Sequence, residues 1–128
     1  MPTHDLTRVT LHLARGPGWP EGSARYGYDI VAPLGHDGHL DAALWRANRA
    51  ACTVRRFRPD EDDHFGMLVH RAGGPGGATW LIDYNSEITE DDERGFRLDR
   101  HRFVKDDYVT FSGEGESHAY KVVEIHPF

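Results

Sequence analysis

The sequence has little sulfur chemistry, because Cys52 is the single cysteine among its 128 residues. Without a second cysteine the chain cannot form an internal disulfide, which suits a reducing compartment. It also has no apolar run close to the ~18 residues of a membrane-spanning helix. Its first residues lack the basic segment and apolar run of a secretory signal. We therefore expect a cytoplasmic protein that has no membrane partner.

Basic residues are also scarce relative to acidic ones. The chain has 15 Lys and Arg against 21 Asp and Glu, which gives a formal net charge of −6. Domains that bind nucleic acid usually carry a basic patch or a high pI, whereas the pI of this sequence is about 5.8. The composition therefore argues against a nucleic-acid partner, and the negative charge is typical of a protein kept soluble by its surface.

The length fits one domain, since domains typically span ~50–200 residues. The 14 glycines and 7 prolines provide many turns, which favours short strands over long helices. No linker, repeat or low-complexity segment divides the chain. We therefore predict a single β-rich domain over residues 1–128.

Apolar residues alternate with polar ones in several short segments. Val9 and Leu11 belong to one such row, and Tyr28 and Ile30 belong to another. A period of two is typical of a half-buried strand. Further segments that we expect to be strands are 52–57, 64–70, 79–84, 96–98, 108–111 and 118–125. In the segment 64–70 the apolar row is Phe65, Met67 and Val69.

These segments, with turn residues between them, predict a mainly β fold of about seven strands. We favour a small antiparallel barrel because closure removes exposed strand edges, and a two-sheet sandwich is the alternative. One helix is predicted near 41–51, with Asp41 as its N-cap. Leu40 and Trp45 stand at the spacing of a hydrophobic staple at its start. We expect this helix to cap the barrel.

Nine histidines raise the hypothesis of a metal site. The candidate ligands are His64, His70, His101 and His118, gathered from neighbouring strands as in a cupin-like barrel. A metal site needs three or four converging N, O or S ligands, yet His64 and His70 would lie about 20 Å apart along one strand. A divalent metal, and a metal-dependent enzyme of cupin-like geometry, are therefore the alternative rather than the favoured interpretation.

The one basic cluster in the sequence is Arg55-Arg56-Phe57-Arg58. Arg55 and Arg56, with Trp80 and Tyr84 nearby, would pair with and stack against an anionic ligand. The plainer interpretation is that these arginines form ion pairs with the acidic residues 60–63. The candidate ligand-binding residues are Arg55, Arg56, Trp80 and Tyr84.

Catalytic signatures are missing from the sequence. There is no pair of carboxylates at a suitable spacing, no G-x-S-x-G elbow, no Cys-x-x-Cys and no Rossmann glycine pattern. Cys52 lies in an apolar pattern, which is typical of a small buried residue rather than a nucleophile. We therefore predict a non-catalytic binding or interaction module whose partner is a small molecule or a protein. A homo-oligomer that pairs edge strands is a further alternative.

A resemblance adds one expectation. The order of features is similar to that in a group of small bacterial proteins without an assigned activity. The features that carry it are Trp45, Cys52, Arg56-Phe57, 80–84, and His101-x-Phe103 followed by Tyr108-Val109. The resemblance implies a small bacterial domain and provides no activity, cofactor or site residue to transfer.

Overall fold

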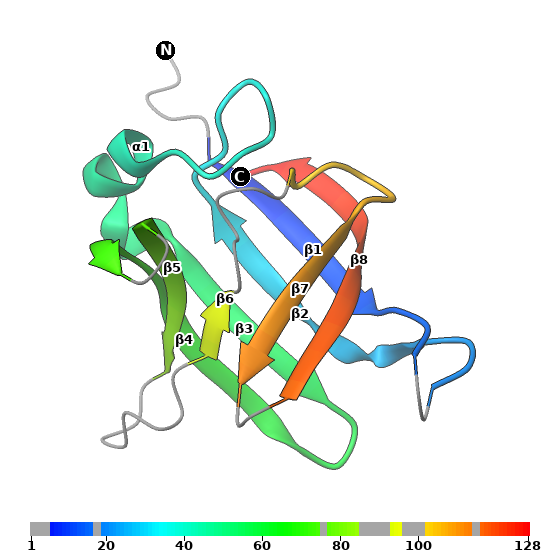
Figure 1. Cartoon of the computed structure of the whole chain (residues 1–128). Helices are drawn as coiled ribbons and strands as arrows, with labels where there is room; N and C mark the ends of the chain where they lie inside the picture. Colours follow the sequence, from blue (N-terminus) through cyan, green and yellow to red (C-terminus); the bar gives the residue numbers. More distant parts are fainter. Residues whose placement is uncertain (1–5, 17–18, 75–76, 85–92, 96–101, 114–115) are drawn as a thin grey trace.

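The computed structural model describes residues 6–16, 19–74, 77–84, 93–95, 102–113 and 116–128. These residues form eight strands and one short α-helix (Figure 1). The strands are β1 Thr7–Leu13, β2 Ser23–Ala32, β3 Thr53–Arg58, β4 Glu61–Gly74, β5 Gly77–Tyr84, β6 Glu93–Gly95, β7 Tyr108–Gly113 and β8 Glu116–Pro127.

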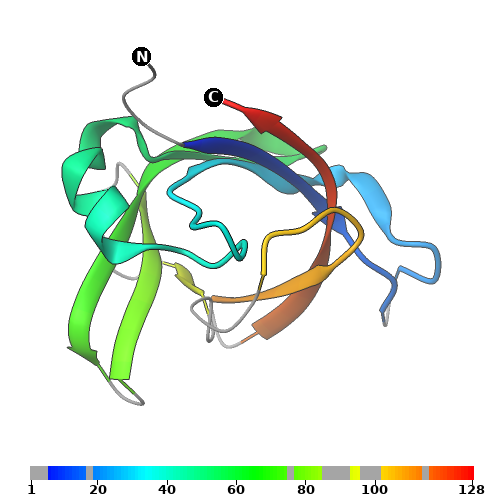
Figure 2. The same ribbon diagram turned by 90° about the horizontal axis from the view of Figure 1, so that it is seen from above.

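The strands form one closed antiparallel barrel in chain order, and β1 pairs with both β2 and β8. The ring is visible when the molecule is viewed from above (Figure 2). The predicted barrel is thus confirmed, and the sandwich alternative is not the arrangement found. β6 was not among the predicted segments, and it pairs with β7 only at Arg94 and Ser112. The predicted strand at 96–98 lies outside the described residues.

The helix lies at one end of the barrel and is shorter than predicted. α1 spans Ala42–Ala47, and a 3₁₀ turn, Arg49–Ala51, follows it. The predicted N-cap is present, because the Asp41 carboxylate accepts a hydrogen bond from the Leu44 amide at 2.9 Å. Asn48 ends α1 with a non-helical φ of −137°, and its side-chain amide donates to the Leu44 carbonyl at 2.9 Å. This local bond competes with continued helix. No helix among the described residues is long and apolar enough to span a membrane.

Trp45 fastens α1 to the barrel. Its indole is buried, and Nε1 donates a hydrogen bond to the Leu68 carbonyl at 2.8 Å. The ring also meets Trp80 edge-on, with centroids 6.0 Å apart. One aromatic residue thus joins the helix to β4 and β5, and the expected capping role of the helix has a specific anchor.

Inward-facing side chains fill the barrel. An eight-stranded barrel has an interior that is just wide enough for side chains or for one small ligand. Here the rings of Tyr28 and Tyr120, from the two strands that flank β1, meet edge-on with centroids 4.9 Å apart. The largest side chains with almost no exposed surface are Tyr28, Leu11, Ile30, Ile82, Val9, Val54, Val109 and Val122. The described interior is therefore a packed core.

Two apolar residues of β4 face away from this core. Phe65 is exposed and Met67 is half-buried. Leu68 is buried inside, and the half-buried Val69 packs against the core. The pairing of Leu68 with the buried Ile82 of β5 sets this orientation, because opposite residues in an antiparallel pair share a face. The barrel therefore carries apolar side chains on its outer surface at β4.

Gly27 of β2 lies under an aromatic ring. It is opposite Phe57 of β3, and that ring covers the glycine and meets His12 edge-on at 6.1 Å. A Cβ atom at position 27 would stand 2.7 Å from Phe57 Cζ and would also collide with the Leu11 carbonyl oxygen. The close approach of ring and backbone at this place requires glycine.

We predict that Gly27→Ala lowers the free energy of unfolding by about 1–3 kcal/mol, as other overpacked sites do. Urea denaturation measures this loss. Gly16→Ala is the matched control, because no atom lies within 4 Å of a Cβ at that position. Equal stability of the two variants would contradict the proposed clash.

Candidate functional site

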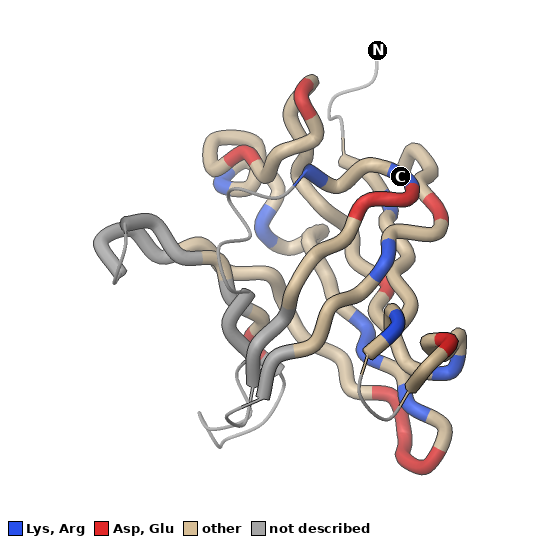
Figure 3. The backbone as a smooth tube through the Cα atoms, turned by 45° about the vertical axis from the view of Figure 1, so that its right-hand side comes forward, with Lys and Arg blue, Asp and Glu red and all other residues tan. Residues whose placement is uncertain are grey.

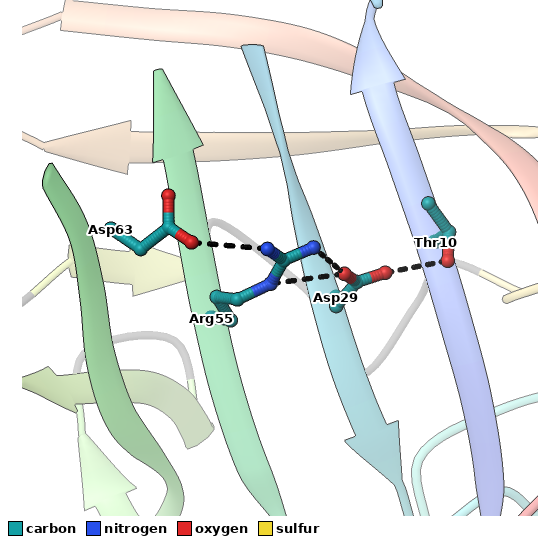
Figure 4. Close-up of polar contacts among 4 residues, drawn as sticks. All are labelled: Thr10, Asp29, Arg55 and Asp63. Carbon is teal, nitrogen blue, oxygen red and sulfur yellow. Dashed lines mark hydrogen bonds and ion pairs between the residues drawn. The ribbon is translucent and has the colours of Figure 1, made fainter. Parts of the chain in front are cut away.

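A polar network crosses four neighbouring strands on the outer face of the barrel (Figure 4). Thr10 of β1 lies opposite Asp29 of β2, which lies opposite Arg55 of β3. Thr10 Oγ1 donates to Asp29 Oδ1 at 2.6 Å. Arg55 bonds Asp29 Oδ2 through both Nε, at 3.1 Å, and Nη2. Its Nη1 donates to Asp63 Oδ2 on β4 at 3.0 Å. Strand register alone therefore assembles the network.

The network keeps Asp29 ionised. Burial by itself would raise the pKa of this carboxyl group, but the hydrogen bonds from Thr10 and Arg55, together with the charges of Arg55 and Arg8, outweigh burial and lower it. The bond to Asp29 in turn raises the pKa of Arg55. Both groups are charged near neutral pH, and three nitrogens of the guanidinium already have acceptors. Arg55 is thus a rigid part of the surface.

A groove lies beside this network, and we call it the outer groove. Its volume is about 330 Å³, at the lower end of the roughly 300–1,000 Å³ of small-molecule sites. Backbone and side chains of β1 to β4 form its wall. The lining residues are Arg8, Asp29, Val31, Thr53, Val54, Arg55, Phe65, Gly66 and Met67.

The outer groove combines apolar surface with the guanidinium of Arg8. Phe65 is 58% exposed beside it, whereas Val31 is only 7% exposed. Arg8 is exposed and acts on Asp29 through its charge, but within the described residues it forms no ion pair. The groove can therefore offer a ligand an aromatic ring, an aliphatic floor and a guanidinium.

The predicted ligand-binding residues do not all meet. Arg55 lies on the outer face and lines the outer groove, whereas its neighbour Arg56 faces the interior opposite Tyr28 and His64. The Arg56 side chain is 13% exposed, and its Nη2 lies 3.3 Å from a Glu61 carboxylate oxygen. Adjacent residues in a strand point to opposite faces, so the two arginines cannot hold one ligand together.

The two predicted aromatic partners lie on β5. Trp80 is buried inside the barrel against Trp45 and His70, so it belongs to the core beneath α1. Tyr84 pairs through its backbone with Gly66 of β4. The side chain of Tyr84 is outside the described part of the structure, so its predicted role stays a prediction.

The predicted histidines are distributed over different places. The ring of His70 lies tilted against that of Trp80, with centroids 4.6 Å apart. His64 lies six positions earlier on the same strand, 3.6 Å from the Glu61 carboxylate. His118 of β8 meets Trp19 edge-on at 5.9 Å. His101 falls outside the described residues.

The structure does not bring His64, His70 and His118 into one cluster. Among the described residues, no group of three or more His, Cys, Asp or Glu is placed to hold a metal ion. The strands also follow one another in chain order around the barrel, whereas a cupin is a two-sheet jelly roll. The metal hypothesis stays a prediction that these positions do not support.

Comparison with known proteins adds nothing to the geometry: no family model, curated protein or solved structure matches this chain. The resemblance to small bacterial proteins therefore stays an expectation. The residues of the barrel surface are the available basis for a function.

Most of the outer groove was missed at the sequence level. Arg8 and Thr10 occupy polar positions of an alternating strand, as does Asp29 in the next one. That alternation was a usable signal, because it places all three on the outer face. The contribution of Phe65 and Met67 had no such signal, since apolar residues in a strand usually face the core.

We predict that Asp29→Asn destabilises the protein by roughly 1–3 kcal/mol near neutral pH, since it removes a charge-assisted bond. Because the folded-state pKa of Asp29 is lowered, its stabilisation is present above the unfolded-state pKa and is lost as pH falls through the folded value. The difference in free energy of unfolding between wild type and Asp29→Asn should therefore become smaller as the pH is lowered. Urea unfolding near neutral pH and below about pH 3 tests this.

Asp63→Asn is the control for this experiment. Asp63 accepts a single bond from Arg55, and its side chain is 36% exposed against 13% for Asp29. Asp63→Asn should therefore lower the free energy of unfolding less than Asp29→Asn does. If the difference in free energy of unfolding between wild type and Asp29→Asn stayed constant with pH, Asp29 would not be the ionised, hydrogen-bonded carboxylate described above.

We predict that Cys52 is unreactive in the folded protein. Burial raises its pKa to about 11 from an ordinary 9.0, so the thiolate is about a hundredfold scarcer than in an exposed thiol. Reaction with a disulfide reagent at mildly alkaline pH should be at least that much slower than in denaturant. The double variant Cys52→Ala, Ala50→Cys places the thiol at an exposed position and should react fast. Fast reaction of the native protein would contradict this burial.

Proposed function

We propose that this protein is a non-catalytic binding module that takes a small ligand in the outer groove. The single observation that carries the proposal is the presence of Arg8, a cation without an ion-pair partner among the described residues, next to apolar surface in a groove of suitable size. Small-molecule sites typically combine mostly apolar walls with a few placed polar groups. The groove has this composition.

The packing of the interior supports an external site. Tyr28, Ile30 and Ile82 fill the described centre of the barrel, so a ligand there would have to displace core side chains. Such displacement costs several kcal/mol per large residue. The outer groove requires no such rearrangement, because its walls are already formed.

The state of the charged groups supports binding rather than proton transfer. A general base works best when its pKa is near the working pH, whereas the pKa of Asp29 is lowered by its hydrogen bonds. The guanidinium of Arg55 is likewise fixed between two carboxylates. These groups shape and orient the groove.

Fragment screening by ¹⁵N-detected NMR tests the proposed function. Fragments that bind should shift the backbone amides of Arg8, Val31, Thr53 and Phe65 together. Thr53→Trp, at an exposed position of the groove, should abolish these shifts by filling the space. Thr110→Trp, on the opposite side of the strand order in β7, is the matched control and should preserve them.

Two outcomes would overturn the proposal. The first is a library in which no fragment shifts the groove amides. The second is binding that survives Thr53→Trp, because the ligand would then lie elsewhere. The melting temperature of both variants, measured alongside, shows that each remains folded during the titration.

A further inference from the structure

We propose that the outer groove selects a small aromatic monocarboxylate. This inference rests on the proposed function and adds the chemical class of the ligand. It follows from which polar atoms of the groove are already engaged, from the shape of its apolar surface and from its size. The barrel surface provides each of these three constraints independently.

The charge balance favours one negative charge on the ligand. Three charged side chains line the outer groove, Arg8, Arg55 and Asp29. Asp29 has both oxygens in hydrogen bonds, and Arg55 is bonded to Asp29 and Asp63. Arg8 is the charged group that stays available, and a guanidinium fits a carboxylate through paired N–H donors.

The wider surface disfavours ligands with several negative charges. The formal net charge of the chain is −6, and acidic and basic positions are interspersed along the described backbone (Figure 3). Attraction at Arg8 is therefore local, whereas the field of the whole protein repels an anion. A single carboxylate gains the local contact with the least repulsion.

The apolar part of the groove fits an aromatic ring. Phe65 lies opposite Arg55 across the β3–β4 pair, and Met67 lies opposite Thr53. An exposed phenyl ring offers a partner for edge-on or offset stacking, and a thioether makes favourable contacts with aromatic rings. Val31 lies opposite Arg8, so the apolar floor begins beside the cation. A ligand with a ring next to a carboxylate matches this order.

The volume sets the upper size of the ligand. A groove of about 330 Å³ can hold a free small molecule with one or two rings, but not the several turns of helix in a typical helix-in-groove complex. We therefore assign the site to a free aromatic acid.

The experiment compares three probes that share one ring system and differ in charge: indole-3-acetate, indole-3-acetamide and tryptamine. NMR titration of the intact protein gives the three dissociation constants. Indole-3-acetate should bind roughly two- to fivefold more tightly than the amide, as expected for an exposed ion pair. Tryptamine should bind most weakly, because its ammonium group faces Arg8.

Two variants locate the effect. Arg8→Gln should bring the affinity for indole-3-acetate down to that for the amide and leave the amide unchanged. Arg46→Gln removes the same charge from an exposed position of α1 and should change neither. The preference for the acid over the amide should also diminish as salt is added.

The other possible results distinguish a wrong ligand class from a wrong binding function. If acid and amide bind the groove equally, the ligand class is wrong and the binding function stands. If none of the three probes binds while other fragments shift the groove amides, the class is also wrong. If no compound shifts those amides, the proposed function fails with it. An effect of Arg46→Gln equal to that of Arg8→Gln would likewise overturn the assignment, because the preference would then not be local.

Discussion

Closure of the barrel through β1 is the constraint on which the other features depend. β1 hydrogen-bonds to β2 on one side and to β8 on the other, which joins the first and last strands of the chain. Once the sheet is closed, each strand has one face inside and one outside. Val9 and Leu11 are then completely buried, and the residue between them, Thr10, must face outward. Which polar side chains lie on the outer surface follows from this division of each strand into an inner and an outer face.

The outer network is a consequence of closure rather than of local sequence. Asp29 and Arg55 are 26 residues apart in the chain, and they meet because β2 and β3 pair in one particular register. A slip of that register by one residue would place Arg55 inside the packed core. Burying a guanidinium without its carboxylate is strongly unfavourable. The ion pair therefore also helps to specify the register that creates it.

The sequence was sufficient for the architecture because alternation is a local property. Val9 and Leu11 identify β1 without knowledge of any neighbour, and Asp41 marks the start of α1 through its own side chain. The site depends on relations between strands, which alternation does not encode. Arg55 and Arg56 looked like one cluster along the chain, yet they occupy opposite faces of β3. In β4, the outward orientation of Phe65 follows only from the pairing of its neighbours with β3 and β5.

The two arginines of the outer groove have different physical roles, and this difference follows from what holds each of them. Arg55 has lost its side-chain freedom to Asp29 and Asp63, so a ligand that bound to it would have to replace bonds that already exist. Arg8 is exposed, and a ligand carboxylate that bound it would gain a bond at the cost of ordering one side chain. Thr10 and Arg55 donate to the two oxygens of Asp29, and among the described residues Arg8 acts on that carboxylate through its charge alone. An exposed cation thus lies beside a structural ion pair and an apolar floor, and such an arrangement favours recognition over chemistry.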